Sequence, residues 1–281
     1  MKIVITGANG QLGRDVVRVF AAENAEVLAW GREDLDIADA AGARKKIKEI
    51  KPELIIHAAA YTQVDACESQ EDLAYTQNAL GARNIAAAAL ASGAAMVYVS
   101  TDYVFDGKST KMYREDDSPI PLNVYGRTKL AGEKMIREIL PRHYICRTSW
   151  LYGEHGSNFV RTILRLASEQ EVLKVVSDQT GTPTWTEDLA RQLYLLVQSG
   201  LYGTYHVSGR GECTWQEFAR DIIKLAGLQV EVLPQSTAEA GRPAPRPGYS
   251  VMDNYRLRLS GLDIMPPWQE SLRRFMAKIG Y

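Results

Sequence analysis

Short apolar runs alternate with helical patterns along the first half of the chain. Strand-like segments recur near residues 2–6, 26–30, 53–57, 95–100 and 143–148, and a helical pattern separates each from the next. This alternation is typical of a parallel, doubly wound sheet. One crossover helix is expected over residues 82–93, because this stretch is rich in alanine and ends at a glycine. The pattern therefore predicts an α/β fold.

The alternation becomes looser after residue 150. Residues 173–176 and 204–208 are further strand-like runs, and a capping box at Thr214 begins a helix that runs to Leu225. We predict a first domain over residues 1–150, to whose sheet residues 172–208 return, and a smaller lobe formed mainly by residues 151–281. Residues 242–248 are rich in proline and contain two arginines, so they form either a linker or a loop that grips an anionic ligand.

Composition narrows the class of protein. The chain has 281 residues and a formal net charge of −1, with acidic and basic residues dispersed, so no nucleic-acid partner is expected. Its three cysteines are widely spaced and form no Cys-x-x-Cys motif, which favours free thiols in a reducing cytoplasm. The first residues form a core strand and no apolar run is long enough for a membrane span, so we expect neither a signal peptide nor a membrane partner.

A glycine-rich turn follows the first strand directly. Its glycines are Gly7, Gly10 and Gly13, spaced Gly-x-x-Gly-x-x-Gly, and a helical pattern comes next. Gly7 permits the turn, Gly10 allows the backbone to approach a pyrophosphate, and Gly13 allows the helix to lie close to the strand. The free N–H groups and the helix dipole then attract phosphate. The turn therefore predicts a site for a dinucleotide.

The second and third strands end in residues suited to the rest of a dinucleotide. Arg32 follows the second strand where NAD-selective proteins commonly have an acid, so it either pairs with the 2′-phosphate of NADP or is a solvated loop residue. Asp36 and Ile37 suit the adenine edge. The third strand ends in the small residues 58–60, which allow a flat cofactor to lie against the backbone.

Tyr125 and Lys129 are spaced i,i+4, which places them on one face of a helix. The cation is expected to lower the pKa of the phenol, which could then exchange a proton with a carbonyl or alcohol oxygen. Thr101, at the end of the fourth strand, would hold that oxygen. The alternative is an ordinary surface pair, which the glycine turn and Thr101 make the weaker interpretation.

Together these features resemble the extended short-chain dehydrogenase/reductase superfamily over roughly the first 150 residues. Four runs, residues 100–107, 121–133, 147–153 and 178–184, also resemble the dTDP-4-dehydrorhamnose reductase family, so the similarity covers nearly the whole chain. The resemblance implies a Rossmann-type sheet with a smaller C-terminal substrate-binding lobe. It also implies reduction of the C4 ketone of a dTDP-sugar, with NADPH or NADH as hydride donor.

The motifs and the resemblance together assign roles to individual residues. Thr101, Tyr125 and Lys129 are expected to be catalytic. The cofactor is expected to contact Gly7, Asn9, Gly10, Gln11, Leu12, Gly13, Arg32, Asp36, Ile37, Ala58, Ala59, Ala60, Tyr61, Asn78, Ser100, Tyr125 and Lys129. The dTDP-sugar is expected to contact Thr101, Asp102, Tyr103, Trp150, Asn158, Phe159 and Arg246, although Tyr103 and Trp150 are alternatively core aromatics.

The resemblance also bears on metal and assembly. Some members of the family dimerise through Mg²⁺ held by acids of the first helix and the C-terminal lobe. Asp15 and Glu187 are candidates here, but the C-terminus ends at Tyr281 without an evident acid, so we predict no metal. The chain is expected to be a monomer or a homodimer.

Related activities remain as alternatives. Sugar-nucleotide 4,6-dehydratases have a glutamate where this chain has Tyr103, so the elimination lacks its base here. A sugar-nucleotide epimerase of the same superfamily is a second possibility, and its cofactor would stay bound through each turnover. A third is a non-catalytic subunit, since the regulatory subunit of a methionine adenosyltransferase resembles this family. The presence of Thr101, Tyr125 and Lys129 makes the third the weakest.

Overall fold

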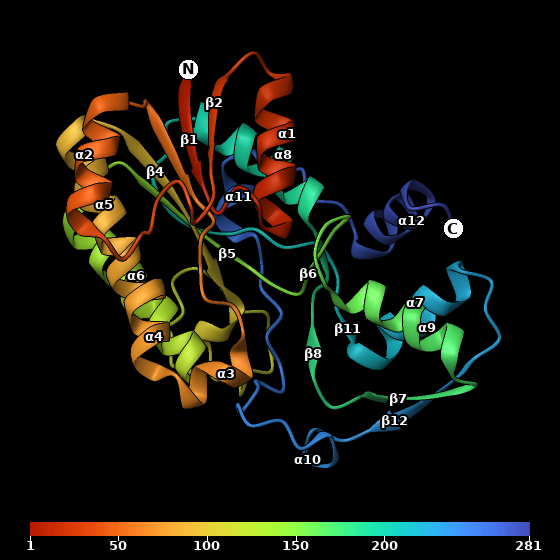
Figure 1. Cartoon of the computed structure of the whole chain (residues 1–281). Helices are drawn as coiled ribbons and strands as arrows, with labels where there is room; N and C mark the ends of the chain where they lie inside the picture. The colour runs from red at the N-terminus through yellow and green to blue at the C-terminus, as the bar shows by residue number, and fades with distance from the viewer.

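The computed structural model describes residues 1–281 and is built around a six-stranded parallel sheet (Figure 1). In spatial order its strands are β10 (Gly203–His206), β5 (His143–Thr148), β4 (Ala95–Thr101), β3 (Leu54–His57), β1 (Lys2–Thr6) and β2 (Glu26–Trp30). All neighbouring pairs are parallel. The predicted doubly wound α/β fold and its five N-terminal strands are confirmed.

Helices cover both faces of this sheet. On one face lie α1 (Gln11–Ala22) and α8 (Thr186–Gln198); on the other lie α2 (Ala40–Ile50), α5 (Gly81–Ser92) and α6 (Val124–Ile139). Each face has its own apolar core, because residues of a buried parallel strand alternate between the two faces. The predicted crossover helix is α5, and Gly93 ends it in the left-handed conformation with φ 74°.

Three short elements lie between β3 and α5. They are α3 (Val64–Ser69), α4 (Glu71–Tyr75) and the π-helical turn η1 (Thr76–Leu80). A 3₁₀ turn, η2 (Asp102–Val104), follows β4 directly. These elements stand beyond the carboxyl ends of the strands. They therefore lie at the edge of the sheet where parallel α/β folds bind ligands.

The second lobe contains small two-stranded sheets and its own helices. Its strand pairs are β7 (Val172–Val176) with β12 (Glu231–Gln235), β8 (Thr180–Gly181) with β11 (Cys213–Thr214), and β6 (Leu151–Tyr152) with β9 (Thr184–Trp185). Its helices are α7 (Phe159–Glu169), α9 (Trp215–Leu225), α10 (Thr237–Ala240) and α12 (Trp268–Lys278), while α11 (Tyr255–Leu259) lies next to β10. In Figure 1 this lobe lies at the lower right of the main sheet, with α12 at its top.

The prediction for residues 172–208 is only partly correct. Helix α8 and strand β10 do return to the main sheet, but β7 pairs with β12 in the second lobe. Val172–Val176 alternates between exposed and buried positions, as expected for a strand with one face on a small core.

None of the helices combines the length and apolar character needed to cross a membrane.

Candidate active site

A cavity of about 710 Å³ lies at the carboxyl ends of β1, β3 and β4 and extends to the second lobe. Most of the predicted site residues line it: Gly7, Asn9, Gly10, Gln11, Leu12, Gly13, Arg32, Asp36, Ile37, Ala58, Ala59, Ala60, Tyr61, Ser100, Thr101, Asp102, Tyr103, Tyr125, Lys129 and Trp150. The glycine turn and the Tyr125–Lys129 pair therefore face one space. It is large enough for a bound small molecule.

The glycine turn is fixed by close backbone packing. Gly7 has φ +72°, and a Cβ there would lie 2.6 Å from the Ala59 nitrogen. A Cβ on Gly13 would lie 2.1 Å from the Gly7 carbonyl oxygen. Helix α1 has Gly10 as its N-cap, no side chain caps it, and its first turn contains no acid. Its N-terminal N–H groups and helix dipole thus remain available to an anion, which fits a pyrophosphate.

Helix α6 presents Tyr125 and Lys129 to the cavity. Its N-terminus is fixed by Asn123, whose Oδ1 accepts from the Gly126 N–H at 2.8 Å. Gly126 is needed because a Cβ there would lie 2.1 Å from the Tyr103 carbonyl oxygen. The helix therefore begins directly against the turn that follows β4. This contact brings Tyr125 next to Thr101.

The charge state of Tyr125 differs from the sequence-based interpretation. Burial raises the pKa of its phenol well above the ordinary value, and the Asp102 carboxylate raises it further, whereas the Thr101 hydroxyl lowers it. The net shift is therefore opposite in direction to the one expected from Lys129 alone. A phenol with a raised pKa stays protonated at neutral pH. It is then poised to donate a proton to a substrate oxygen.

Lys129 is buried, with 2 % of its surface exposed. Its Nζ lies 4.0 Å from the centroid of the Tyr98 ring, a cation–π contact. Burial lowers its pKa to about 7, and the Glu133 carboxylate one turn along α6 opposes that shift. Lys129 has no salt bridge of its own in the structure. Its ammonium is thus available to a hydroxyl placed in the cavity.

Glu133 belongs to a buried network that joins α6 to two strands. The Arg147 guanidinium of β5 donates to both of its carboxylate oxygens, at 2.9 and 2.8 Å. Ser100 Oγ of β4 donates to it at 2.6 Å. Ser100 lines the cavity as predicted, but its hydroxyl is committed to this network. The network holds the end of β4 in register with the helix that carries Tyr125.

Two tryptophans form the wall of the cavity on the side of the second lobe. The rings of Trp150 and Trp215 stack with their centroids 3.5 Å apart and their planes 6° apart. Trp150 has φ 47°, an unusual backbone conformation for a large side chain, and its ring occupies the space above Gly181. Both indoles line the cavity, so Trp150 is not simply a core aromatic.

Four predicted site residues do not line the cavity. Asn78 donates to the Tyr61 carbonyl and accepts from the Tyr61 N–H, so it positions Tyr61 instead. Asn158 caps α7 and donates to Gln11 at 2.9 Å. Phe159 packs against Trp215, with ring centroids 4.5 Å apart. These residues support the cavity wall from behind.

Arg246 is the fourth of these residues. Its guanidinium forms two hydrogen bonds with the Asp65 carboxylate, at 2.9 and 3.0 Å. Asp65 also accepts from the Ala244 N–H at 3.2 Å. The proline-rich segment is therefore attached to α3. Arg246 does not line the cavity, and its charge is already paired with Asp65. It therefore offers no free guanidinium to an anion in the cavity.

Sequence reasoning missed several residues that line the cavity: Thr6, Gly31, Leu35, Thr62, Val64, Leu73, Gln77, Val99, Thr148, Ser149, Leu151, Ser157 and Trp215. For most of them no local motif marks the role. Trp215 is different, because it stands at the first position of a helix opened by a capping box. The capping box predicted where this helix begins, and it therefore marked Trp215 as a large aromatic side chain at the start of a helix.

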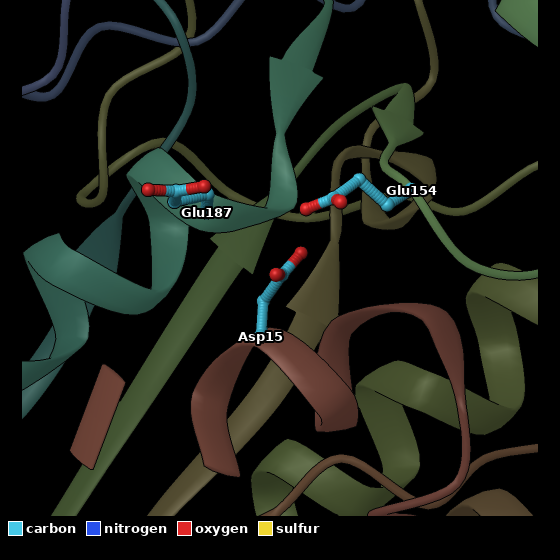
Figure 2. A group of neighbouring side chains, drawn as sticks. All are labelled: Asp15, Glu154 and Glu187. Atoms are coloured by element: carbon cyan, nitrogen blue, oxygen red, sulfur yellow. The ribbon is translucent and has the colours of Figure 1, made fainter. Parts of the chain in front are cut away.

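Figure 2 shows three neighbouring carboxylates, those of Asp15 in α1, Glu187 in α8 and Glu154 after β6. None of the three lines the main cavity. Cations already neutralise them. Arg18 lies 3.0 Å from Asp15 and 2.7 Å from Glu187, and Lys278 Nζ lies 2.6 Å from both Glu154 and Glu187. Glu154 is the third acid that the sequence did not reveal. The absence of a metal here stays a prediction, and the described ion pairs favour it.

We expect Glu187→Gln to lower the free energy of unfolding by about 2–3 kcal/mol at neutral pH. Burial raises the pKa of Glu187, but the hydrogen bonds from Lys278, Arg191 and Arg18 together outweigh this effect and lower the pKa from 4.5 to about 2. A depressed acid stabilises the fold above its unfolded pKa, and this stabilisation is lost as pH falls from about 4.5 toward 2. Urea unfolding at several pH values measures it.

The control is Glu169→Gln, which removes an exposed i,i+4 pair with Arg165. It should cost only ~0.3–0.5 kcal/mol. Equal losses for the two variants would contradict the assignment of Glu187 to a stabilising buried cluster.

The chain is similar to known proteins over its full length. A family model described as "RmlD substrate binding domain" matches residues 1–280. The spore coat polysaccharide biosynthesis protein SpsK of Bacillus subtilis is 43 % identical over 98 % of this chain and 96 % of its own length.

Two crystal structures named as dTDP-4-dehydrorhamnose reductases also match. That from Clostridium acetobutylicum is 46 % identical, covers 100 % of both chains and has a TM-score of 0.98. That from Bacillus anthracis, in complex with NADP, is 46 % identical, covers 99 % of both chains and has a TM-score of 0.97.

Proposed function

The chain belongs to the RmlD substrate-binding-domain family, and we propose that it reduces the C4 ketone of dTDP-6-deoxy-L-lyxo-4-hexulose to dTDP-L-rhamnose with NADPH or NADH. The observation that carries the proposal is that Thr101, Tyr125 and Lys129 line the same cavity as the glycine turn. A proton donor and a dinucleotide site thus share one space. The family relatives named for this reaction support the same substrate class.

The residues divide the work of the reduction. When bound, the nicotinamide cofactor supplies the hydride that adds to C4. Tyr125 donates its phenolic proton to the C4 oxygen, so the carbonyl becomes an alcohol, and the raised pKa keeps that proton available. The Thr101 hydroxyl hydrogen-bonds the same oxygen as its negative charge develops. Lys129 would hold the nicotinamide ribose and thereby place the hydride donor relative to Tyr125.

The cavity walls suit the remaining parts of the two ligands. The first turn of α1 would hold the pyrophosphate of the cofactor, and the small residues 58–60 would allow the flat cofactor to lie against the backbone. Tyr103 and Trp150 are proposed to contact the sugar, whereas both carboxylate oxygens of Asp102 already accept hydrogen bonds from Thr101 and Ser250. Trp215 extends this wall and offers a stacking surface to the substrate.

A coupled assay tests the proposal. The 4-keto-rhamnose nucleotide is generated in situ, and NADPH consumption is measured together with the formation of the deoxysugar product. One NADPH should be oxidised for each product formed. An epimerase would interconvert sugars without net NADPH oxidation, and a non-catalytic subunit would do neither, so either result would overturn the proposal.

We expect NADPH to be used at least as well as NADH, with a preference of only a few-fold. Arg32 lines the cavity at the end of β2, is exposed and makes no salt bridge, so its guanidinium is available to a 2′-phosphate. An exposed ion pair of this kind contributes roughly 0–1 kcal/mol. The measurement compares kcat/KM for the two cofactors in the wild type and in Arg32→Ala.

Raising the salt concentration should weaken the preference, because an exposed ion pair is screened. Arg44→Ala, on the exposed surface of α2, is the control. A strong preference for NADH, or an NADPH preference that survives Arg32→Ala, would show that Arg32 does not recognise the phosphate.

A further inference from the structure

Asp102 joins the end of β4 to a distant segment of the chain. It is buried, with 2 % of its surface exposed, and it follows Thr101 directly. Its Oδ1 accepts from the Thr101 hydroxyl at 3.0 Å, and its Oδ2 accepts from the Ser250 hydroxyl at 2.6 Å. Ser250 is itself held in place, because its N–H donates to the Thr180 carbonyl at 2.8 Å. Both carboxylate oxygens are therefore occupied.

These contacts restrict what Thr101 can do. A threonine hydroxyl has a single proton to donate. Its oxygen also accepts from the Tyr103 N–H at 3.2 Å. While Asp102 is ionised it can only accept, so the Thr101 proton is committed to it. The oxygen of a ketone that is being reduced requires a donor. An ionised Asp102 thus prevents Thr101 from stabilising that oxygen.

Protonation of Asp102 reverses this arrangement. A carboxylic acid protonated at Oδ1 donates to Thr101 Oγ1, and Oδ2 still accepts from Ser250. The Thr101 proton is then free to point into the cavity. No heavy atom has to move, because both hydrogen bonds remain and only the direction of one changes.

The surroundings of Asp102 favour the protonated form. Asp102 forms no ion pair, a property that it shares among the buried acids only with Glu115. The others each pair with an arginine: Asp15, Glu133, Glu187, Asp188 and Asp253. An unpaired carboxylate is costly to bury. Burial accordingly raises the pKa of Asp102 to about 6, although its hydrogen bonds from Ser250 and Thr101 oppose the shift.

Few other titratable groups face this carboxyl. They are Tyr125 from α6 and Tyr103 from η2, and burial keeps both phenols protonated at neutral pH. Arg246 and Asp65 face Tyr103 from the other side, but they pair with each other. Lys129 titrates in the same cavity, and its charge must be separated from that of Asp102 by experiment.

We propose that Asp102 is a positioning residue for the reduction: its protonated carboxyl releases the Thr101 hydroxyl to donate to the substrate oxygen, and its carboxylate withdraws that donor. This inference rests on the proposed function and adds a group that acts through Thr101. Its signature is a turnover number that falls as pH rises through the titration of Asp102.

Asp102→Asn is the main test. The side-chain amide donates to Thr101 and accepts from Ser250, as the protonated acid does, and it does not titrate. We expect this variant to keep kcat within about threefold of the low-pH value of the wild type and to lose the part of the fall between about pH 5 and pH 8 that the titration of Asp102 causes. Any dependence on Lys129 remains in both proteins and cancels in the comparison.

Ser250→Ala supplies a second, directional test. It removes a hydrogen bond that lowers the pKa of Asp102, so the midpoint of the fall in kcat should move to higher pH. In a Thr101→Val background, Asp102→Asn should change nothing further, because the group that it controls is gone. A merely structural role for Asp102 would produce neither result.

The proposal is overturned if wild-type kcat is independent of pH in this range, or if Asp102→Asn loses more than tenfold and keeps the wild-type pH profile. Infrared difference spectra add a readout that does not depend on turnover. The carboxylic acid band lost between low and neutral pH should be absent in Asp102→Asn, and identical spectra would also overturn the proposal. Failure of the reaction itself would instead appear as no NADPH oxidation by the wild type at any pH.

Discussion

Tyr125→Phe is expected to lower kcat by at least about a hundredfold while the affinity for NADPH stays within about twofold. The substitution removes only the transferable proton, and the ring keeps its edge-on contact with Tyr103, 5.9 Å away between centroids. Turnover is measured at saturating cofactor, and cofactor affinity is measured by direct titration. The two readouts separate loss of proton donation from loss of binding.

Tyr75→Phe provides the matched control, since Tyr75 is exposed at the end of α4 and does not line the cavity. It should leave kcat unchanged. A loss of less than tenfold in Tyr125→Phe corresponds to only ~1.4 kcal/mol of barrier. Such a result would show that Tyr125 is not the proton donor.

Lys129→Met is expected to weaken cofactor binding and to lower kcat by about a hundredfold or more, because the group that holds the ribose is lost. The same change should not lower the free energy of unfolding. The pKa of this lysine falls from 10.5 in the unfolded chain to about 7 in the fold, so the unfolded state binds more protons at neutral pH. The charged lysine therefore costs stability, and a methionine of similar length removes that cost.

Lys134→Met on the exposed face of α6 is the control, and it should affect neither activity nor cofactor affinity. Titration of the cofactor and thermal unfolding above and below pH 7 check the Lys129 variant. Normal cofactor affinity with a normal rate would remove both roles of Lys129. A large loss of stability would instead indicate that its side chain supports the fold.

Local features of the sequence were sufficient to predict the glycine turn and the Tyr125–Lys129 pair, which line one cavity. The turn after β1 needs a residue at positive φ and a residue without Cβ beneath the helix, and Gly7 and Gly13 meet these needs. Tyr125 and Lys129 face one cavity because four residues make about one helical turn. In each case the interacting residues are close in sequence, so their spacing carries the information.

The wall contributed by the second lobe was predicted less well. Arg246 was expected to bind the dTDP-sugar, but its guanidinium donates both of its paired hydrogen bonds to Asp65, a residue 181 positions away. Trp215 was not predicted to line the cavity, although it stacks on Trp150. The strand-like run Val172–Val176 also gave no sign of which sheet it joins. Such pairings depend on how distant segments pack. A strand with one buried face has the same alternation of apolar and polar residues in either sheet, so the pattern does not identify its partner.

The sequence by itself determined the parallel α/β order, the glycine turn and the spacing of Tyr125 and Lys129 on one helix face, since these depend on local conformational preference and helical period. Only the tertiary structure decided the electrostatics. It buries Tyr125 beside Asp102, which raises the pKa that the spacing with Lys129 alone was expected to lower. It also brings Ser250 to Asp102 across 148 residues. Desolvation and long-range hydrogen bonds arise only when the chain is folded, so no local pattern encodes them.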